Sequence, residues 1–359
     1  MIELLTEKQS LWEHLKQTDK PIFIYGMGDG ALKIIHVLEQ LGIPFEGIYA
    51  SNNFVRGHSF CGYKVLRLDE VTAMHGKNFI SLLAFATFRP EMLEVLYALQ
   101  DECEFYAPDV PVVKTDDEVF DHAYIQKHNE QFTKVYNMLA DDWSKKVMID
   151  TLNFKVSGKI DYLKGITTNI SEVYEIIKPT GHEHYVDLGA YNGDTVSEFL
   201  RYSNGSIEQI YAFEPDVKNF KRLHKRIDEE KITNINTFNI GAWSEKTVLH
   251  FSGKGGRNSK LENTGVIEVQ ANSVDHILQG KKATTIKFDV EGAEYQALLG
   301  CKETIQAYAP KLMVSSYHKN EDLYALPLLI HELNPNYKFY LRHHPYIPCW
   351  ETNYYCVVK

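Results

Sequence analysis

The sequence Val186-Asp187-Leu188-Gly189-Ala190-Tyr191-Asn192-Gly193-Asp194-Thr195 decides the fold of this chain. It contains the end of a short apolar run and then two glycines, a pattern typical of a strand that turns sharply into a helix. Ligands of open α/β sheets bind at the carboxyl ends of the strands, where such turns lie. The free N–H groups and positive dipole end of the following helix favour the same place. Because glycine turns also occur for structural reasons alone, a function needs further motifs.

Two later segments, Phe213-Glu214-Pro215-Asp216 and residues 288–294 (FDVEGAE), also follow apolar, β-branched runs. Each should therefore end a strand at the same sheet edge. Glu214 lies one βαβ unit after Asp187, where a carboxylate can accept hydrogen bonds from both ribose hydroxyls. The three carboxylates of the later segment would repel one another unless hydrogen bonds, a metal or a cation such as a sulfonium offset their charge. The alternative is that the acidic residues only cap helices, which fits Asp216 best.

These three motifs, in this order, resemble the FkbM-type family of S-adenosylmethionine-dependent methyltransferases. The most distinctive stretch is Asp-x-Glu-Gly-x-Glu followed by Leu-x-Gly, at residues 289–300, and the resemblance covers roughly residues 170–359. It implies a seven-strand methyltransferase fold with an antiparallel final hairpin, S-adenosylmethionine as the cofactor, and O-methylation of a sugar or polyketide hydroxyl. It also implies that Asp187, Gly189 and Gly193 surround the methionine part of the cofactor and that Glu214 holds the ribose.

The expected cofactor pocket combines these motifs with the loop after the third strand, which would flank the adenine. Its residues are Asp187, Gly189, Tyr191, Asn192, Gly193, Asp194, Glu214, Pro215, Gly241, Ala242 and Asp289. The first motif lacks the third glycine of the dinucleotide pattern G-x-G-x-x-G, which disfavours a nicotinamide cofactor there.

Methyl transfer to an alcohol requires an enzyme that aligns the acceptor and removes its proton. His318 follows the fifth strand and titrates near neutral pH, so it is the candidate base. Asp289 and Glu291 are expected to orient it or the acceptor. A structural role for His318, or a metal held by these three residues, are the alternatives, and the pattern predicts no metal. Residues 342–344 (RHH) would either contact the acceptor or lie on the surface.

The second half of the chain is predicted to alternate strands and helices. The expected strands are Tyr185–Leu188, Gln209–Phe213, Ile235–Asn239, Val248–Phe251, Val266–Ala271, Thr285–Asp289, Lys311–Ser316, Tyr337–His343 and Tyr354–Lys359. The expected helices are Asp194–Tyr202, Asp216–Glu230, Ser273–Leu278, Glu294–Leu299, Cys301–Ala307 and Asp322–Leu333. No helix separates the last two strands, so they should form an antiparallel hairpin.

The first part of the chain predicts a βαβ unit of its own. A helix over residues 1–20 precedes the strand Ile22–Tyr25, the glycine-rich turn at residues 26–30 (GMGDG), a helix Ala31–Leu41 ended by Gly42, and a strand Phe45–Tyr49. Further strands are expected at Lys64–Leu66, as an edge, and Asn78–Ala84, with a helix at Pro90–Leu99. The turn could cradle a phosphate. The next strand, however, runs into Ala50-Ser51-Asn52 without a carboxylate for a ribose, which weakens an NAD site.

The predicted fold is therefore α/β: a Rossmann-like seven-strand methyltransferase domain at 171–359, preceded by a smaller Rossmann-like domain at 1–115 and a helical connector at 116–170. In the connector, Phe132, Val135, Tyr136, Leu139 and Trp143 recur at helical spacing. We expect the connector to pack on the second domain and partly cover its active site. The small domain could bind a nucleotide or sugar, or mediate a homodimer.

Composition limits the class of protein. With 359 residues, 44% hydrophobic, the chain can bury ample core, and its net charge of −10 argues against nucleic acid or an anionic membrane as partner. The N-terminus lacks a signal-peptide pattern, the longest apolar stretch is too short to span a bilayer, and five scattered cysteines fit a reducing compartment. The expectation is a cytoplasmic enzyme with a saccharide or other small-molecule substrate. The alternatives are an NAD-dependent sugar-modifying enzyme and a non-catalytic nucleotide-sugar-binding protein.

Overall fold

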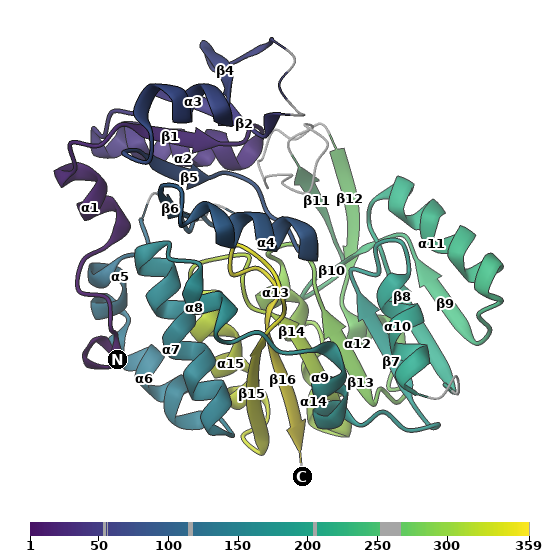
Figure 1. The fold of residues 1–359 in the computed structure, drawn as a ribbon. Coiled ribbons are helices and arrows are strands. Elements are labelled where there is room, and N and C mark those ends of the chain that lie inside the picture. Colours follow the sequence, from purple (N-terminus) through teal and green to yellow (C-terminus); the bar gives the residue numbers. More distant parts are fainter. Residues whose placement is uncertain (53–54, 56, 114–117, 204–206, 252–266, 359) are drawn as a thin grey trace.

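The computed structural model describes residues 1–52, 55, 57–113, 118–203, 207–251 and 267–358. The chain forms two large sheets with helices around them (Figure 1). A six-stranded sheet has the order β3-β4-β2-β1-β5-β6, and a seven-stranded sheet has the order β15-β16-β14-β13-β7-β8-β9. A third, smaller sheet has the order β10-β12-β11.

The six-stranded sheet contains the predicted βαβ unit. Its elements are η1 (Ile2–Leu4), α1 (Leu11–Gln17), β1 (Ile22–Tyr25), α2 (Asp29–Leu41), β2 (Gly47–Ala50), β3 (Ser59–Phe60), β4 (Tyr63–Arg67), α3 (Leu68–His75), β5 (Ile80–Leu83), α4 (Pro90–Leu99) and β6 (Glu104–Tyr106). Gly42 ends α2 in the left-handed conformation, as predicted. The sequence patterns did not indicate α3, β3 or β6, and β4 is not an edge strand, because β3 pairs with its outer side.

The single helix predicted over residues 1–20 is wrong. A short 3₁₀ turn, η1, is separated from α1 by an extended segment. The break has a local cause: the Ser10 side chain accepts a hydrogen bond from the Glu13 N–H at 3.2 Å, and the Glu13 carboxylate accepts one from the Ser10 N–H at 2.8 Å. This capping box makes α1 begin at Leu11.

Four connector helices follow: α5 (His122–Lys127), α6 (Asn129–Met138), α7 (Asp142–Ser157) and α8 (Asp161–Lys164). They lie beside the final hairpin, with α7 against β15 and α6 against α15 (Figure 1). Of the residues at helical spacing, Phe132 and Val135 are buried, whereas Trp143 is 38% exposed and donates to the Thr168 hydroxyl at 3.1 Å. The connector thus packs on the second half of the chain, as expected.

The last part of the chain alternates strands and helices as predicted. Its elements are α9 (Ile170–Ile177), β7 (His184–Leu188), α10 (Asp194–Tyr202), β8 (Gln209–Phe213), α11 (Val217–Glu230), β9 (Ile235–Phe238), β10 (Gly241–Ala242), β11 (Thr247–Phe251), β12 (Ile267–Asn272), α12 (Val274–Leu278), β13 (Thr285–Phe288), α13 (Glu294–Leu299), α14 (Lys302–Tyr308), β14 (Lys311–Ser315), α15 (Asp322–Leu333), β15 (Tyr337–His343) and β16 (Thr352–Val358). Val266 and Lys359, the outer ends of two predicted strands, lie outside the described residues.

Strand pairing gives the seven-stranded sheet its predicted form. Strands β14, β13, β7, β8 and β9 pair in parallel, and β16 pairs antiparallel with both β14 and β15, so the final hairpin is confirmed. Strands β11 and β12 do not join this sheet. They pair with each other and with β10 in the separate three-stranded sheet.

One hydrophobic core runs through the three predicted parts of the chain. It includes Phe23 and Phe105 of the first sheet, Phe132 of the connector, and Phe213 and Phe339 of the seven-stranded sheet. A buried bridge between Thr87 and Ile347 also joins the two halves. None of the described helices is both long and apolar enough to cross a membrane.

Candidate active site

The carboxyl ends of β7, β8, β13 and β14 meet at one edge of the sheet, as expected for parallel neighbours. The turn after β7 and the turn after β13 touch there. A Cβ on Gly189, whose φ is +82°, would lie 1.8 Å from the Asp289 carbonyl oxygen. Only glycine fits this crossing of two backbones. The resemblance placed Gly189 around the methionine part of the cofactor, and the structure adds close approach to the segment after the neighbouring strand as a reason for glycine at this position.

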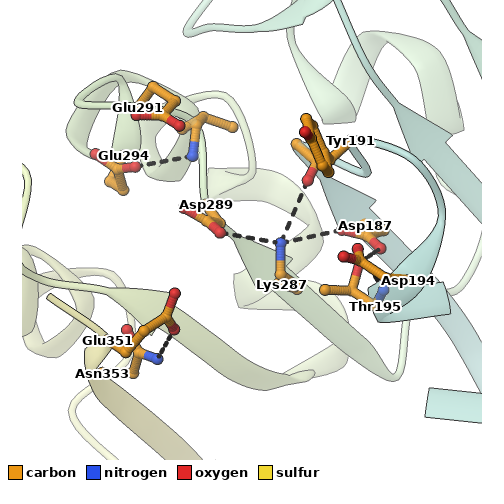
Figure 2. A network of polar contacts seen from close by, with 12 residues as sticks. Asp187, Tyr191, Asp194, Thr195, Lys287, Asp289, Glu291, Glu294, Glu351 and Asn353 are labelled. Carbon is orange, nitrogen blue, oxygen red and sulfur yellow. Dashed lines mark hydrogen bonds and ion pairs between the residues drawn. The ribbon is translucent and has the colours of Figure 1, made fainter. Parts of the chain in front are cut away.

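Lys287 lies at the centre of a buried ion-pair network at this edge (Figure 2). Its Nζ is 3.4 Å from Asp187 Oδ1, 3.6 Å from Asp289 Oδ2 and 3.4 Å from the Gly189 carbonyl oxygen. Burial opposes charge on Lys287, but the two carboxylates raise the pKa of this lysine well above its usual value. Lys287 lies outside the motifs that the sequence indicated. Its signal was a lysine in the middle of an otherwise apolar strand.

Asp187 is fully buried and accepts a hydrogen bond from the Thr195 hydroxyl at 2.5 Å. Burial raises its pKa, against the opposing effect of Lys287. Its Oδ1 atom has no hydrogen-bond partner, although Lys287 lies within ion-pair distance. The first motif thus delivers a buried carboxylate to the sheet edge, as predicted.

Glu214, at the end of β8, is 5% exposed. One carboxylate oxygen accepts the Tyr191 N–H and the other the Asp216 N–H, both at 2.8 Å. Burial raises the pKa of Glu214 to about 7, although these two hydrogen bonds act in the opposite direction. The carboxylate therefore ties the turn after β7 to the turn after β8. Asp216 caps α11 through the N–H groups of Lys218 and Asn219, which confirms the capping role expected for it.

The remaining residues of the expected cofactor pocket line the same turns. Gly193 has a φ of +83°, and a Cβ there would lie 2.9 Å from Leu223 Cδ1. The Asn192 side chain accepts from the Asp194 N–H at 3.1 Å, and the Asp194 carboxylate is exposed. Gly241 and Ala242 form β10, which follows β9 in the chain but belongs to the three-stranded sheet and not to the seven-stranded sheet.

His318, directly after β14, joins the acidic loop after β13. Glu294 is fully buried, accepts the Val290 N–H at 2.8 Å, and lies 3.0 Å from His318 Nδ1. His318 Nε2 lies 3.6 Å from both Asp289 Oδ1 and Glu291 Oε2. The structure thus brings together the three residues proposed for catalysis. It adds Glu294 as the partner that fixes the imidazole.

The charge state of His318 follows from these neighbours. Burial alone would lower its pKa, but the carboxylates of Glu294, Asp289 and Glu291 raise it to about 10. The imidazole is therefore protonated at neutral pH and acts as the cation that offsets the acidic cluster. Asp289, Glu294 and His318 offer ligand atoms within 4.8 Å of one another, close enough to share a metal ion. Binding of a metal there would first require loss of the imidazolium proton.

Two further residues extend the network and carry no signal in the sequence. The Tyr317 hydroxyl lies 3.4 Å from Asp289 Oδ1 and 3.5 Å from Glu351 Oε1. Burial and the charge of Asp289 raise the pKa of Glu351. Glu351, Glu291 and Tyr191 all have positive φ angles, of 61°, 53° and 47°. Such strained backbone clusters at functional sites.

Residues 342–344 make structural contacts. Arg342 is buried and pairs with Asp141 at 2.6 Å. His343 is fully buried, which lowers its pKa to about 3, and His344, which is half-buried, has its Nδ1 atom 3.0 Å from the Thr168 carbonyl oxygen. All three tie β15 and the following loop to neighbouring structure, so the expected surface placement is wrong for Arg342 and His343.

The glycine turn after β1 has a packing explanation. A Cβ on Gly26 would lie 2.8 Å from Phe85, and one on Gly30 would lie 2.2 Å from the Ala84 carbonyl oxygen. The carboxylate of Asp29, in the first turn of α2, pairs with Lys33 at 2.9 Å. Two of the three glycines are thus required by the residues that directly follow β5.

The comparison with known families decides the class of the domain. The family model described as methyltransferase FkbM domain matches residues 187–339, which hold all three motifs. Residues 187–339 are therefore similar to an FkbM-type methyltransferase domain. This agrees with the resemblance seen in the sequence, which implies S-adenosylmethionine as the cofactor.

Solved structures support the fold. The FkbM methyltransferase from Methylobacillus flagellatus KT matches with a TM-score of 0.74 at 20% identity, over 98% of this chain and 94% of that one. The match extends through the first sheet and the connector, so the whole α/β arrangement has a structural counterpart. Two other solved structures are more distant. An rRNA methylase from Streptococcus thermophilus matches with a TM-score of 0.36 at 14% identity, over 54% of this chain and 99% of that one. A SAM dependent methyltransferase from Aquifex aeolicus matches with a TM-score of 0.33 at 10% identity, over 56% of this chain and 99% of that one. No curated protein matches the sequence.

Proposed function

We propose that this methyltransferase O-methylates a sugar or related hydroxyl in polysaccharide or natural-product biosynthesis, in the cytoplasm. The observation that carries the proposal is the convergence of Asp187, Glu214 and Asp289 at the ends of three adjacent parallel strands. The cofactor supplies a methyl group already activated by a positively charged sulfonium. The protein must hold that cofactor and prepare the acceptor.

The residues present fit the cofactor. Each oxygen of Glu214 accepts one backbone N–H and has a further lone pair for a ribose hydroxyl. Among the described residues of this network, the four carboxylates of Asp187, Asp289, Glu291 and Glu294 face two cations, Lys287 and His318, so the pocket tolerates a further positive group. We assign Glu214 to the ribose. We assign the turns at 187–194 and 241–242, together with Pro215 and Asp289, to the remaining cofactor contacts.

The structure changes the role that we propose for His318. A protonated imidazole cannot accept the proton of an alcohol, so we propose a role other than that of the base for His318 at neutral pH. We propose that the imidazolium positions the carboxylates of Asp289 and Glu291, which face its Nε2 atom. These carboxylates orient the acceptor hydroxyl and take up its proton as the methyl group is transferred.

The test is methyl transfer to a panel of neutral saccharides, followed as S-adenosylhomocysteine release. Turnover that depends on a saccharide supports the proposal. Asp289→Asn should abolish turnover and leave cofactor binding within about tenfold, because Lys287 remains paired with Asp187. Cofactor binding without turnover on any hydroxyl acceptor would refute O-methylation and favour the non-catalytic nucleotide-sugar-binding alternative.

A further inference from the structure

Three aromatic side chains, Phe88, Tyr346 and Trp350, form a platform beside the active site. The Phe88 and Tyr346 rings stack with centroids 5.9 Å apart and planes at 28°, and the Tyr346 and Trp350 rings lie 6.0 Å apart at 30°. Phe88 is 64% exposed, the highest value among the large exposed hydrophobic side chains of the described residues. Tyr346 and Trp350 are half-buried beside it. Apolar surface that several side chains share and that is partly exposed marks binding sites.

The platform is held rigidly from both halves of the chain. Phe88 follows β5 of the first sheet, whereas Tyr346 and Trp350 belong to the loop between β15 and β16. Next to Phe88, the Thr87 N–H donates to the Ile347 carbonyl at 2.8 Å, and the Ile347 N–H donates back at 3.0 Å. Both residues of this bridge are buried. The two segments therefore hold the aromatic rings in place before any ligand binds.

The platform leads directly to the acidic cluster. Trp350 precedes Glu351, whose carboxylate contacts the Tyr317 hydroxyl at 3.5 Å. Tyr317 in turn lies 3.4 Å from Asp289 Oδ1, at the end of β13. The positive φ of Glu351, 61°, turns the chain at the junction between the aromatic rings and the carboxylates. One loop thus carries two of the aromatic rings and, in the next residue, a carboxylate of the acidic cluster.

We propose that the platform is the acceptor subsite and that it stacks on the apolar face of a neutral pyranose ring, whose hydroxyls donate to Glu351 and Asp289. This inference rests on the proposed function and specifies its substrate class. A pyranose has one face of C–H groups and a rim of hydroxyl donors, which matches aromatic rings bordered by carboxylate acceptors. The carboxylates of Glu351, Asp289 and Glu291 would repel a phosphorylated or otherwise anionic ligand.

The experiment compares the wild type with Phe88→Ala, Phe88→Trp and Val95→Ala, the last being an exposed apolar control on α4. With a neutral saccharide that the wild type methylates, Phe88→Ala should raise the KM for that acceptor about tenfold, as expected for loss of one aromatic contact. Phe88→Trp should restore it, and the affinity for S-adenosylhomocysteine should stay unchanged in all three variants. An acceptor KM unaffected by Phe88→Ala would overturn the subsite.

A binding measurement separates this inference from the proposed function. Titration of the wild type with neutral oligosaccharides, without cofactor, should change tryptophan fluorescence through Trp350, and Phe88→Ala should weaken this response. Binding of saccharide without methyl transfer would leave the subsite standing and refute the proposed function. Methyl transfer to an acceptor whose KM is the same in wild type and Phe88→Ala, or preferential binding of adenosine or uridine monophosphate to the platform, would refute the subsite alone.

Discussion

Replacement of Glu214 by glutamine is the sharpest test of the cofactor pocket. The carboxylate accepts the Tyr191 and Asp216 N–H groups, one on each oxygen. A glutamine has one carbonyl oxygen and one NH₂ group, so the NH₂ group must face one of these two donors. The variant therefore loses one charge-assisted hydrogen bond, worth about 1.5–3 kcal/mol, as well as an acceptor for a ribose hydroxyl.

We expect Glu214→Gln to weaken binding of S-adenosylhomocysteine by roughly 10- to 100-fold, about 1.4–2.8 kcal/mol. Isothermal titration calorimetry measures this directly. The matched control is Asp216→Asn, two residues away, which alters only an exposed helix cap and should change affinity less than about threefold. Unchanged affinity in a folded Glu214→Gln variant would refute the ribose assignment.

The same variant makes a separate prediction for stability. Burial raises the pKa of Glu214 from 4.5 to about 7 in the folded state, so the folded protein holds this proton more tightly than the unfolded chain. Protonated Glu214 therefore contributes up to about 3 kcal/mol to the free energy of unfolding. This contribution is fully present below pH 4.5 and is lost as the pH rises through 7. Glutamine has no such titration. The melting temperature of the wild type should therefore fall more steeply between pH 5 and 7 than that of Glu214→Gln, and parallel curves would contradict the raised pKa.

Three further perturbations test the rest of the site. The pKa of His318 is about 10, above its usual 6.5, so the charged imidazole stabilises the fold fully below pH 6.5 and less as the pH rises through 10. The pH profile of kcat should therefore show no titration of His318 between pH 6 and 9. If kcat instead rises with pH over that range and His318→Gln abolishes the rise, His318 is the base. Lys287→Met should destabilise the protein by about 3–5 kcal/mol in urea unfolding, since it leaves buried carboxylates unpaired, whereas the exposed Lys282→Met should change little. Gly189→Ala should lower the free energy of unfolding by at least about 2 kcal/mol more than Gly280→Ala does, because both glycines have a positive φ but only a Cβ at residue 189 meets backbone atoms. Equal losses of stability in the two variants would show that the contact with the Asp289 carbonyl is not the cause.

The sequence predicted most of the secondary structure of the second half of the chain for a local reason. Strands β7, β8 and β13 are buried on both faces, so each reads as a short apolar run followed by glycine or acidic residues. The same property placed Asp187, Glu214 and Asp289 correctly at one edge. The helix predicted over residues 1–20 is too long because leucines at helical spacing continue across Ser10, where the capping box begins a separate helix.

Other features depend on contacts between residues far apart in the chain. Strands β11 and β12 have ordinary strand patterns, and only their pairing excludes them from the main sheet. A histidine with no known neighbours has a pKa near neutrality. Three carboxylates from the loop and helix after β13 change that pKa, and sequence spacing alone cannot supply the distances to His318. Arg342 and His343 show the converse, since these charged and polar residues near a predicted sheet edge are buried in structural contacts.

By itself, the sequence determined the strand–turn–helix motif at Val186–Thr195, its two companion motifs and hence the class of cofactor, because these signals are local and repeat at the ends of buried strands. The tertiary structure decided why Gly189 must be glycine, which cation balances the acidic cluster, and which residues border the acceptor side. Those properties depend on the Asp289 carbonyl, on Lys287 and His318, and on Glu351 beside its aromatic platform. Steric contact and electrostatic energy depend on distance in space, and folding brings these residues together from separate strands and loops.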